Sequence, residues 1–417
     1  MSAVPERSAG FQPAGAGGIR AASEDSGQDA RRTRSQDGYA TLPRSAWVEV
    51  DLAALAQNFR LIRAELPART RLLYVVKDNA YGLGAVRAAQ TTLANGADQL
   101  AVFTLGEAAE LRDAGIHAPI LLLGERLPDE LPWVLELGLE TCVGRIEIAR
   151  QLDELARRNG RRAPVQVKVN TGMNRFGLPW RGVAQWSREL AQLNGLEFVG
   201  VLSHFAQSDE LEKAFAQTQL ARFEQCVATL RAAGVRPKLV HHCNSGGFLD
   251  LPNAHFDVVR VGLLAQGVYP SSVCRRLPGL RPVMSVKARI VAIQELEIGD
   301  TVGYGMRWRA EQPSRIGVLS LGYGDGFPRV RNEGGALVRG QCAPIVGGVT
   351  MDALMIDLTA VPAAQVGDET VLLGRQGDAE ITAQEIAALK RSVSYDVLVN
   401  WRARLPRRYV GENSKLQ

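Results

Sequence analysis

Several features that mark specialised classes of protein are absent from this chain of 417 residues. Its five cysteines are widely spaced and form no CxxC pair, which argues against a disulfide framework and a structural zinc site. No apolar run approaches the ~20 residues that a membrane span needs. The N-terminus also lacks the charged and apolar regions of a secretory signal. We therefore expect a cytoplasmic protein with no membrane partner.

An excess of charge of one sign is also missing, because the net charge is only +5 at pH 7. The basic residues form no stripe with interleaved aromatics, so we expect no nucleic-acid partner. Metal-ligand spacings are absent as well: His241 and His242 are adjacent on a predicted strand and would point to opposite faces. We expect no metal site. Hydrophobic residues at 46% and charged residues at 22% are instead typical of a globular protein.

Residues 1–44 differ in composition from the rest of the chain. They are rich in Gly, Ala, Ser, Arg and Asp, and they contain few large apolar side chains. Such a segment buries too little apolar surface to offset the entropy of ordering, so we expect a disordered tail. Order is expected from Trp47 onward, where an alternating strand leads to Asp51, a helix N-cap, and to a helix that Pro67 ends.

Short apolar segments then alternate with segments of helical periodicity. Strands are predicted near residues 71–76, 99–104, 119–123, 139–143, 165–170, 198–204, 239–244 and 257–261. Eight such strands, each nearly all apolar and most followed by a helix, are typical of a (β/α)8 barrel. A doubly wound open sheet is the competing arrangement, but its GxGxxG fingerprint is missing. We predict an α/β protein with an N-terminal (β/α)8 TIM-like barrel over residues 45–281.

The pattern changes over residues 282–417. Strands are predicted at 283–296, 315–321, 343–358 and 370–373, separated by turn signals such as Gly324-Asp325-Gly326. One short helix is expected at 383–390. These features predict a second, mostly antiparallel β domain after the barrel.

Polar side chains close several of the predicted barrel strands, and barrel enzymes carry their active sites at these strand ends. The residues are Lys77, Lys168, His204, Asn244, Ser245 and Arg260. Each one alone is ordinary loop polarity, but together they indicate a site on one rim. A lysine at such an apolar mouth has a lowered pKa, and its neutral amine can form a Schiff base.

Phosphate binding is indicated near two of these strand ends. The segment Asn244-Ser245-Gly246-Gly247 ends a strand and opens a possible helix, so its N–H groups and hydroxyl can hold a phosphate. The segment Arg260-Val261-Gly262-Leu263 ends the last strand, where barrels often bind phosphate. A lysine and a phosphate site in one barrel point to pyridoxal phosphate.

These residues lie in motifs that resemble those of alanine racemases. The first two matching segments are VKDNAYGLG at 76–84 and KVNTGMNRFG at 168–177. The others follow in family order: SHFA at 203–206, NS at 244–245, RVG at 260–262, VGYG at 302–305, GYGDGFPR at 322–329, VTMD at 349–352 and SYDV at 394–397. Asn170, Thr350 and Gly324 depart from residues that are frequent in the family, and we expect them to alter the rate rather than the reaction.

The resemblance implies a homodimer with shared active sites that interconverts L- and D-alanine with pyridoxal phosphate and supplies D-alanine for peptidoglycan. Lys77 would form the Schiff base with the cofactor, and Tyr304 of the second subunit would be the other base. The residues that would hold the cofactor are Tyr81, His204, Ser245, Arg260, Gly262, Leu263 and Tyr395. Those that would bind the substrate carboxylate are Arg175 and the backbone of Met351. Lys168 matches a lysine that is often carbamylated. The residues expected to contact and orient these site residues, without touching cofactor or substrate, are His241, Asn244, Tyr323 and Asp352.

Three other functions fit parts of the pattern. A pyridoxal-phosphate decarboxylase of basic amino acids has the same two-domain plan, but Tyr304 and the context of Arg175 speak against it. A non-enzymatic carrier of the cofactor would not need the β domain. A broad-spectrum amino-acid racemase also stays open, although such proteins are usually exported and this chain shows no signal.

Overall fold

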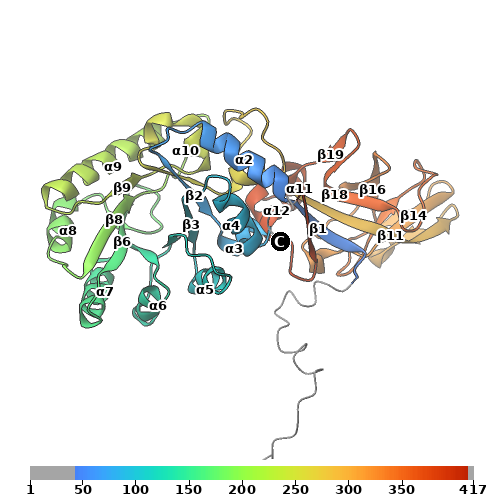
Figure 1. The fold of residues 1–417 in the computed structure, drawn as a ribbon. Helices are drawn as coiled ribbons and strands as arrows, with labels where there is room; N and C mark the ends of the chain where they lie inside the picture. The colour runs from blue at the N-terminus through green and yellow to red at the C-terminus, as the bar shows by residue number, and fades with distance from the viewer. Residues whose placement is uncertain (1–42, 412–417) are drawn as a thin grey trace, which may run out of the picture.

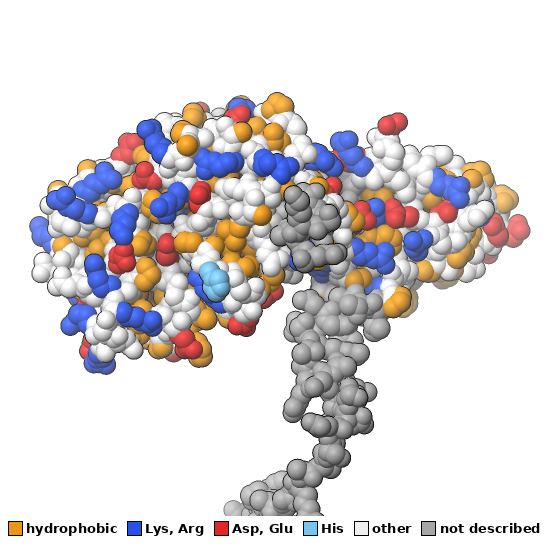
Figure 2. Space-filling view, viewed as in Figure 1, with side chains coloured by type: hydrophobic (Ala, Val, Ile, Leu, Met, Phe, Trp, Pro, Cys, Tyr) orange, Lys and Arg blue, Asp and Glu red, His pale blue; other side chains and the backbone are white. Residues whose placement is uncertain are grey.

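The computed structural model describes residues 43–411. Figure 1 shows two units side by side, a barrel of strands and helices and a second unit rich in β-sheet. Among the described residues, no helix combines the length and the apolar character that crossing a bilayer requires. Figure 2 shows lysine, arginine, aspartate and glutamate side chains scattered over the face that it presents, across both units.

Eight parallel strands form the barrel, as predicted. In sheet order they are β10 (Val258–Val261), β2 (Arg71–Val75), β3 (Gln99–Val102), β4 (Ile120–Leu122), β5 (Glu140–Val143), β6 (Ala163–Asn170), β8 (Leu196–Leu202) and β9 (Leu239–His241), and the short β7 (Leu178–Pro179) pairs with β6. Two backbone hydrogen bonds connect β9 and β10 with the residues that flank them, from Asp257 N to Val240 O at 3.0 Å and from Arg260 N to Cys243 O at 3.2 Å. The eight strands therefore form a nearly closed circle.

Helices follow most of these strands and cover them on the outside (Figure 1). They are α3 (Lys77–Tyr81), α4 (Ala85–Leu93), α5 (Leu105–Asp113), α6 (Leu131–Glu136), α7 (Ile146–Arg158), α8 (Val183–Leu190), α9 (Ala214–Ala232) and α10 (Ser245–Asp250). The preceding helix α2 (Leu52–Ala64) begins at the predicted cap, because Asp51 Oδ1 accepts a hydrogen bond from Ala54 N at 2.9 Å. Its apolar residues Leu55, Phe59 and Ile62 are fully buried.

The second unit is built on one mostly antiparallel sheet, as predicted. Its order is β19 (Ala379–Ile381), β18 (Glu369–Gln376), β15 (Gly335–Val338), β16 (Gln341–Val346), β17 (Leu354–Asp357), β14 (Ser314–Leu319), β11 (Met284–Leu296), β1 (Ala46–Asp51) and β20 (Arg407–Val410). A small hairpin joins β12 (Thr301–Val302) to β13 (Trp308–Arg309). The remaining helices are α11 (Ala383–Lys390), where a helix was expected, and α12 (Ser394–Val399), which was not expected.

Two details differ from the predicted arrangement. The first strand, β1, was assigned to the barrel, but it pairs with β11 and β20 and so belongs to the second sheet. The segment 343–358 was predicted as one strand, but it is the hairpin of β16 and β17. The chain turns after β16 at Gly347, whose φ of 70° lies in the left-handed region that glycine adopts without strain.

The predicted tail lies mostly outside the described residues, since the structure describes nothing before residue 43. Arg44 was assigned to that tail, yet its Nη2 forms an ion pair of 2.6 Å with the buried Asp325 Oδ1. The same Asp325 oxygen forms a second ion pair with Arg404 Nε at 2.9 Å. Arg44 therefore belongs to the packed structure and not to the predicted tail. The other domain boundaries stay predictions.

Candidate active site

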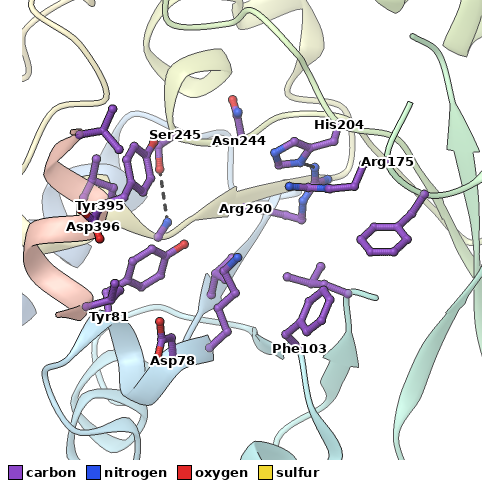
Figure 3. Close-up of a pocket in the computed structure, with 18 of the residues that line it drawn as sticks. Asp78, Tyr81, Phe103, Arg175, His204, Asn244, Ser245, Arg260, Tyr395 and Asp396 are labelled. Atoms are coloured by element: carbon purple, nitrogen blue, oxygen red, sulfur yellow. Dashed lines mark hydrogen bonds between the residues drawn. The ribbon is translucent and has the colours of Figure 1, made fainter. Parts of the chain in front are cut away.

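A cavity of about 680 Å³ lies at the C-terminal ends of the barrel strands, where α12 of the second unit reaches over the rim. Many of the predicted site residues line it: Lys77, Tyr81, Lys168, Arg175, His204, Asn244, Ser245, Arg260, Gly262, Leu263 and Tyr395. Figure 3 shows Tyr81, Ser245 and Tyr395 gathered on one side, and His204, Arg260 and Arg175 on the other. The cavity therefore has one region of hydroxyl groups and one of basic side chains.

Lys77 follows the end of β2 and faces this cavity. Burial lowers the pKa of its amine below the ordinary value of 10.5, and the positive charge of Arg175 lowers it further. The negative charges of Glu107 and Asp78 oppose that change. A larger share of the Lys77 amine is therefore neutral near pH 7 than for an exposed lysine, which favours nucleophilic attack on an aldehyde.

The four residues after Lys77 form a left-handed turn. Asp78, Asn79, Ala80 and Tyr81 have φ values of 53–54°. Left-handed conformation costs roughly 1–2 kcal/mol for each non-glycine residue, so the turn persists only where its surroundings enforce it. Three hydrogen bonds do so: Asp78 N donates to Glu107 Oε1 at 2.6 Å, Ala85 N to Asn79 Oδ1 at 2.7 Å, and Gln266 Nε2 to Ala80 O at 2.8 Å. As a result, Lys77 and Tyr81, at the two ends of this turn, both line the cavity.

The hydroxyl side of the cavity is suited to an anion. Gly262 N donates to Ser245 Oγ at 3.3 Å, and the rings of Tyr81 and Tyr395 are neighbours with centroids 6.4 Å apart. Burial raises the pKa of both tyrosines well above the usual range, so their hydroxyls stay protonated and can donate. Asn244 Oδ1 accepts from Gly247 N at 2.9 Å and so caps the helix that starts at Ser245. The hydroxyls of Tyr81, Ser245 and Tyr395 and the backbone N–H groups of Gly262 and Leu263 form a cradle that can hold a phosphate.

Replacing Gly262 with alanine should weaken phosphate binding without unfolding the barrel. A Cβ at this position would lie 2.5 Å from Tyr81 Oη, so the tyrosine hydroxyl must move out of the cradle. Losing one such donor costs about 1–3 kcal/mol, which raises the dissociation constant of pyridoxal phosphate by about 5- to 150-fold. Titration of the apoprotein measures this constant. Gly106→Ala is the matched control, since its Cβ would meet nothing within 4 Å. Equal affinity of both variants would contradict the role of this cradle.

Arg260 links the cavity to the barrel interior. Its Nη2 donates to Ser203 O at 2.8 Å and to His204 Nδ1 at 3.1 Å, and its Nη1 donates to His241 Nδ1 at 2.9 Å. Burial lowers the pKa of Arg260 to about 10, so the guanidinium stays charged at pH 7. Burial and that charge hold the pKa of His204 and of His241 well below the usual range. Both imidazoles are therefore neutral and can accept from Arg260.

The basic side of the cavity contains a second lysine. Lys168 is buried, and this burial, together with the charges of Arg260 and Arg175, lowers its pKa to about 7. About half of the Lys168 side chains are therefore neutral at neutral pH. A neutral amine next to fixed positive charges is the form that can react with carbon dioxide, because the resulting anion is attracted by the neighbouring cations.

Several predicted residues do not reach this cavity in a single chain. Tyr304 and Met351 are 83% and 53% exposed, and neither lines the cavity. Asp352 instead accepts a hydrogen bond from Arg404 Nη2 at 2.6 Å. Tyr323 N donates a hydrogen bond to Thr350 O at 2.9 Å, so Tyr323 supports the segment that carries Met351.

Sequence reasoning missed several residues that line the cavity. They are Val75, Asp78, Phe103, Leu123, Phe176, Val393, Asp396 and Val399. Phe103 directly follows the end of β3, so the rule that identified the polar strand ends would have found it if apolar residues had been considered. Val393, Asp396 and Val399 lie in or beside α12, whose position over the rim depends on contacts between the two units.

Comparison with known proteins gives a consistent result along most of the described chain. Residues 50–270 match the family "Alanine racemase, N-terminal domain", and residues 283–409 match "Alanine racemase, C-terminal domain". This chain belongs to the alanine racemase family. It is accordingly a pyridoxal-phosphate-dependent racemase, an isomerase, and its two-unit architecture is that of the family.

Individual alanine racemases are similar over nearly their full lengths. The alanine racemase of Syntrophobacter fumaroxidans is 42% identical over 353 residues, which cover 84% of this chain and 94% of the relative. That of Symbiobacterium thermophilum is 40% identical over 372 residues, covering 89% and 98%. Among solved structures, alanine racemase from Clostridium difficile 630 has a TM-score of 0.85 at 31% identity, covering 90% of this chain and all of that one. The Bacillus anthracis alanine racemase with bound L-Ala-P has a TM-score of 0.82 at 34% identity, covering 89% and 97%.

Proposed function

We propose that this protein interconverts L- and D-alanine by a two-base reaction in the cavity described above. The observation that carries the proposal is the convergence of Lys77, the hydroxyl cradle and Arg260 on one cavity. A decarboxylase of basic amino acids is not favoured, since the matching families and relatives are alanine racemases.

The residues of the cavity fit pyridoxal phosphate. The cradle of Tyr81, Ser245, Tyr395 and the backbone of Gly262 and Leu263 would hold the phosphate. Arg260 would donate a hydrogen bond to the pyridine nitrogen, and His204 would pack against the ring. Because an arginine does not give up its proton, this nitrogen would stay unprotonated. When bound, the cofactor withdraws electrons from the substrate Cα and makes its hydrogen acidic.

The other residues would orient alanine and move its proton. Arg175 and the backbone N–H of Met351 would bind the carboxylate. Racemisation removes a proton from one face of Cα and returns one on the other, so two bases on opposite faces are required unless one swings across. Lys77 Nζ would serve one face and Tyr304 Oη the other.

Two subunits are needed for this set of residues. Within one chain Tyr304, Met306 and Met351 are 83%, 68% and 53% exposed, although such large side chains are usually at least partly covered. We propose that a second copy of the chain covers them and so places its Tyr304 and Met351 at the cavity of the first. Each active site would then be completed by residues of both subunits.

Lys168 should carry a carbamate. Its pKa of about 7 leaves much of the amine neutral, and the anion formed with carbon dioxide would reverse the charge next to Arg175. The expected outcome is a protein that gains one carboxyl group on Lys168 in bicarbonate buffer, seen in a high-resolution structure or by native mass spectrometry. Lys168→Ala should remove the gain, whereas Lys238→Ala, an exposed lysine, should keep it. An unmodified Lys168 with no anion beside Arg175 would refute this prediction.

The decisive experiment measures the product directly. Purified protein is incubated with L-alanine, L-serine or L-lysine, and the enantiomers are separated by chiral chromatography. We expect D-alanine to form much faster than D-serine or D-lysine. Comparable rates with all three would instead identify a broad-spectrum racemase, and no D-amino acid at all would refute the proposal. In a bacterial cytoplasm, the D-alanine formed would be available for peptidoglycan synthesis.

A further inference from the structure

A line of polar side chains crosses the interior of the barrel, from the cavity to the opposite end of the strands. His241 Nδ1 accepts from Arg260 Nη1 at 2.9 Å, and His241 Nε2 lies 2.5 Å from Gln166 Oε1. Gln166 Nε2 in turn donates to Glu140 Oε2 at 2.5 Å. Glu140 is the first residue of β5, so the line ends far from the rim that carries Lys77. Among these residues only Arg260 lines the cavity.

The donors and acceptors in this line all point the same way. A carboxylate only accepts, so Glu140 must face the amide nitrogen of Gln166, and the amide oxygen then faces His241. His241 must therefore carry its proton on Nε2, which leaves Nδ1 free to accept from Arg260. The buried, neutral state of His241 described above agrees with this single tautomer. The negative charge of Glu140 is thus connected to the guanidinium of Arg260 through two neutral groups.

The local backbone makes room for this line. The pairing of β6 with β8 shifts by one residue between Val165 and Gln166, which places Gln166 opposite Gly200. A Cβ at Gly200 would lie 2.8 Å from Gln166 Oε1, so a larger residue would displace the amide. A bulge and a glycine in a barrel strand are features that re-aim a side chain or admit a close approach. Gln166 is completely buried, as is His241.

The Glu140 carboxylate, at the end of the line, accepts hydrogen bonds from two glutamine side chains. Gln99 Nε2 donates to the same Glu140 oxygen at 2.7 Å, and the charges of Arg71 and Glu197 act on the pKa of Glu140 in opposite directions. Burial raises the pKa of Glu140, while the hydrogen bonds from Gln166 and Gln99 oppose the rise. A partly buried carboxylate is unfavourable unless it is well hydrogen-bonded, and Glu140 does not line the cavity.

We propose that Glu140 and Gln166 are positioning residues that act through His241 to orient and polarise Arg260. The proposal rests on the proposed function in one respect, since Arg260 is the group expected at the pyridine nitrogen. Among the described residues, Arg260 donates only through Nη1 and Nη2, so its Nε–H remains available for that contact. Glu140 would fix the orientation of the Gln166 amide, and that amide would in turn fix the tautomer of His241.

The test begins with apoprotein labelled with ¹⁵N in its histidines, so that it does not depend on cofactor or activity. In the wild type, the ring of His241, assigned by its loss in His241→Gln, should show a protonated Nε2 and an unprotonated Nδ1. Gln166→Leu removes the acceptor of Nε2, and Glu140→Gln removes the charge while keeping the shape. Both should shift the His241 ring resonances. Gly200→Ala should do the same by displacing Gln166 without removing a polar group.

A matched control and a double variant separate this role from simple stabilisation. Gln99→Leu deletes the other donor to Glu140 and should leave the His241 resonances unchanged. If Glu140 acts through Gln166, Glu140→Gln should add no further shift in the Gln166→Leu background. In the holoenzyme, Gln166→Leu should lower kcat by about 2- to 30-fold, the usual range for a coupled network, with little change in KM.

Specific outcomes would overturn the proposal. These are unchanged His241 resonances in folded Gln166→Leu protein, or additive effects of the two substitutions. If Gln166→Leu does not fold, the isosteric Glu140→Gln and Gly200→Ala carry the test. Failure of the proposed function would appear differently, as a wild-type protein that forms no D-alanine while its His241 resonances still respond to Gln166 and Glu140.

Discussion

Replacing Tyr304 with phenylalanine should affect the two directions of the reaction unequally. If Tyr304 removes the proton from L-alanine and Lys77 removes it from D-alanine, exchange of the α-hydrogen of L-alanine with deuterium should fall by about 10²–10⁴-fold. Exchange of D-alanine should persist, because Lys77 is intact. Net racemisation should fall with the L-alanine exchange, since each turnover needs both bases. Proton NMR in deuterium oxide measures both exchange rates, and chiral chromatography measures the net reaction.

The control for this variant must separate chemistry from assembly. Tyr269→Phe removes a phenol that hydrogen-bonds the backbone of Leu277, outside the lining of the cavity, and should leave both exchange rates near those of the wild type. Light scattering shows whether the Tyr304→Phe protein keeps the oligomeric state of the wild type. Equal loss of both exchanges, or dissociation into monomers, would instead mean that Tyr304 is a packing residue of the interface.

Mixed dimers test the origin of Tyr304 directly. If each site combines Lys77 of one subunit with Tyr304 of the other, a dimer of one Lys77→Ala chain and one Tyr304→Phe chain contains one intact site. Random mixing of equal amounts should then restore about one quarter of the wild-type activity. If both residues of a site came from the same chain, no mixed dimer would contain an intact site. Mixtures as inactive as the separate variants would therefore refute the shared site.

Much of the barrel could be predicted because its signal is local. Each strand is a short apolar segment, and helical periodicity between the strands needs no knowledge of distant contacts. The misplaced strand β1 shows the limit of this reasoning. Its alternating pattern at residues 46–51 predicts a strand but not its partners, and those partners are β11 and β20, more than 230 residues away in the sequence.

The site residues likewise fall into two groups, those that a local sequence signal indicates and those that depend on distant contacts. Lys77, Lys168, His204 and Arg260 could be found because strand ends meet at one rim of a parallel barrel. Gln166 and Glu140 could not, because a single polar residue within an apolar strand does not indicate which side chain it will meet. Their contact depends on the register shift opposite Gly200 and on the closing of the sheet. The position of α12 over the rim likewise depends on packing between the two units.

Lys77→Ala should remove both the covalent attachment of the cofactor and the base for D-alanine. We expect racemisation to fall by at least about 10²–10⁴-fold, the usual contribution of one positioned base, with further loss from the missing Schiff base. The wild-type holoenzyme should be yellow. Borohydride should bleach it and leave the cofactor, as a stable label, on Lys77. Lys77→Ala should take up no borohydride-fixed label, while the exposed-lysine variant Lys238→Ala should behave like the wild type.

The pH dependence of cofactor attachment gives the same assignment a second test. Only the neutral amine attacks the aldehyde, and burial lowers the pKa of Lys77 below 10.5. The rate of attachment to the apoprotein should therefore rise with pH and level off below pH 10.5, whereas the rate for an exposed lysine would continue to rise up to that pH. Stopped-flow absorbance measures the rate at each pH. A label found on Lys168 instead, whose pKa is about 7, would transfer the attachment to that lysine and leave Lys77 as a neighbouring charge.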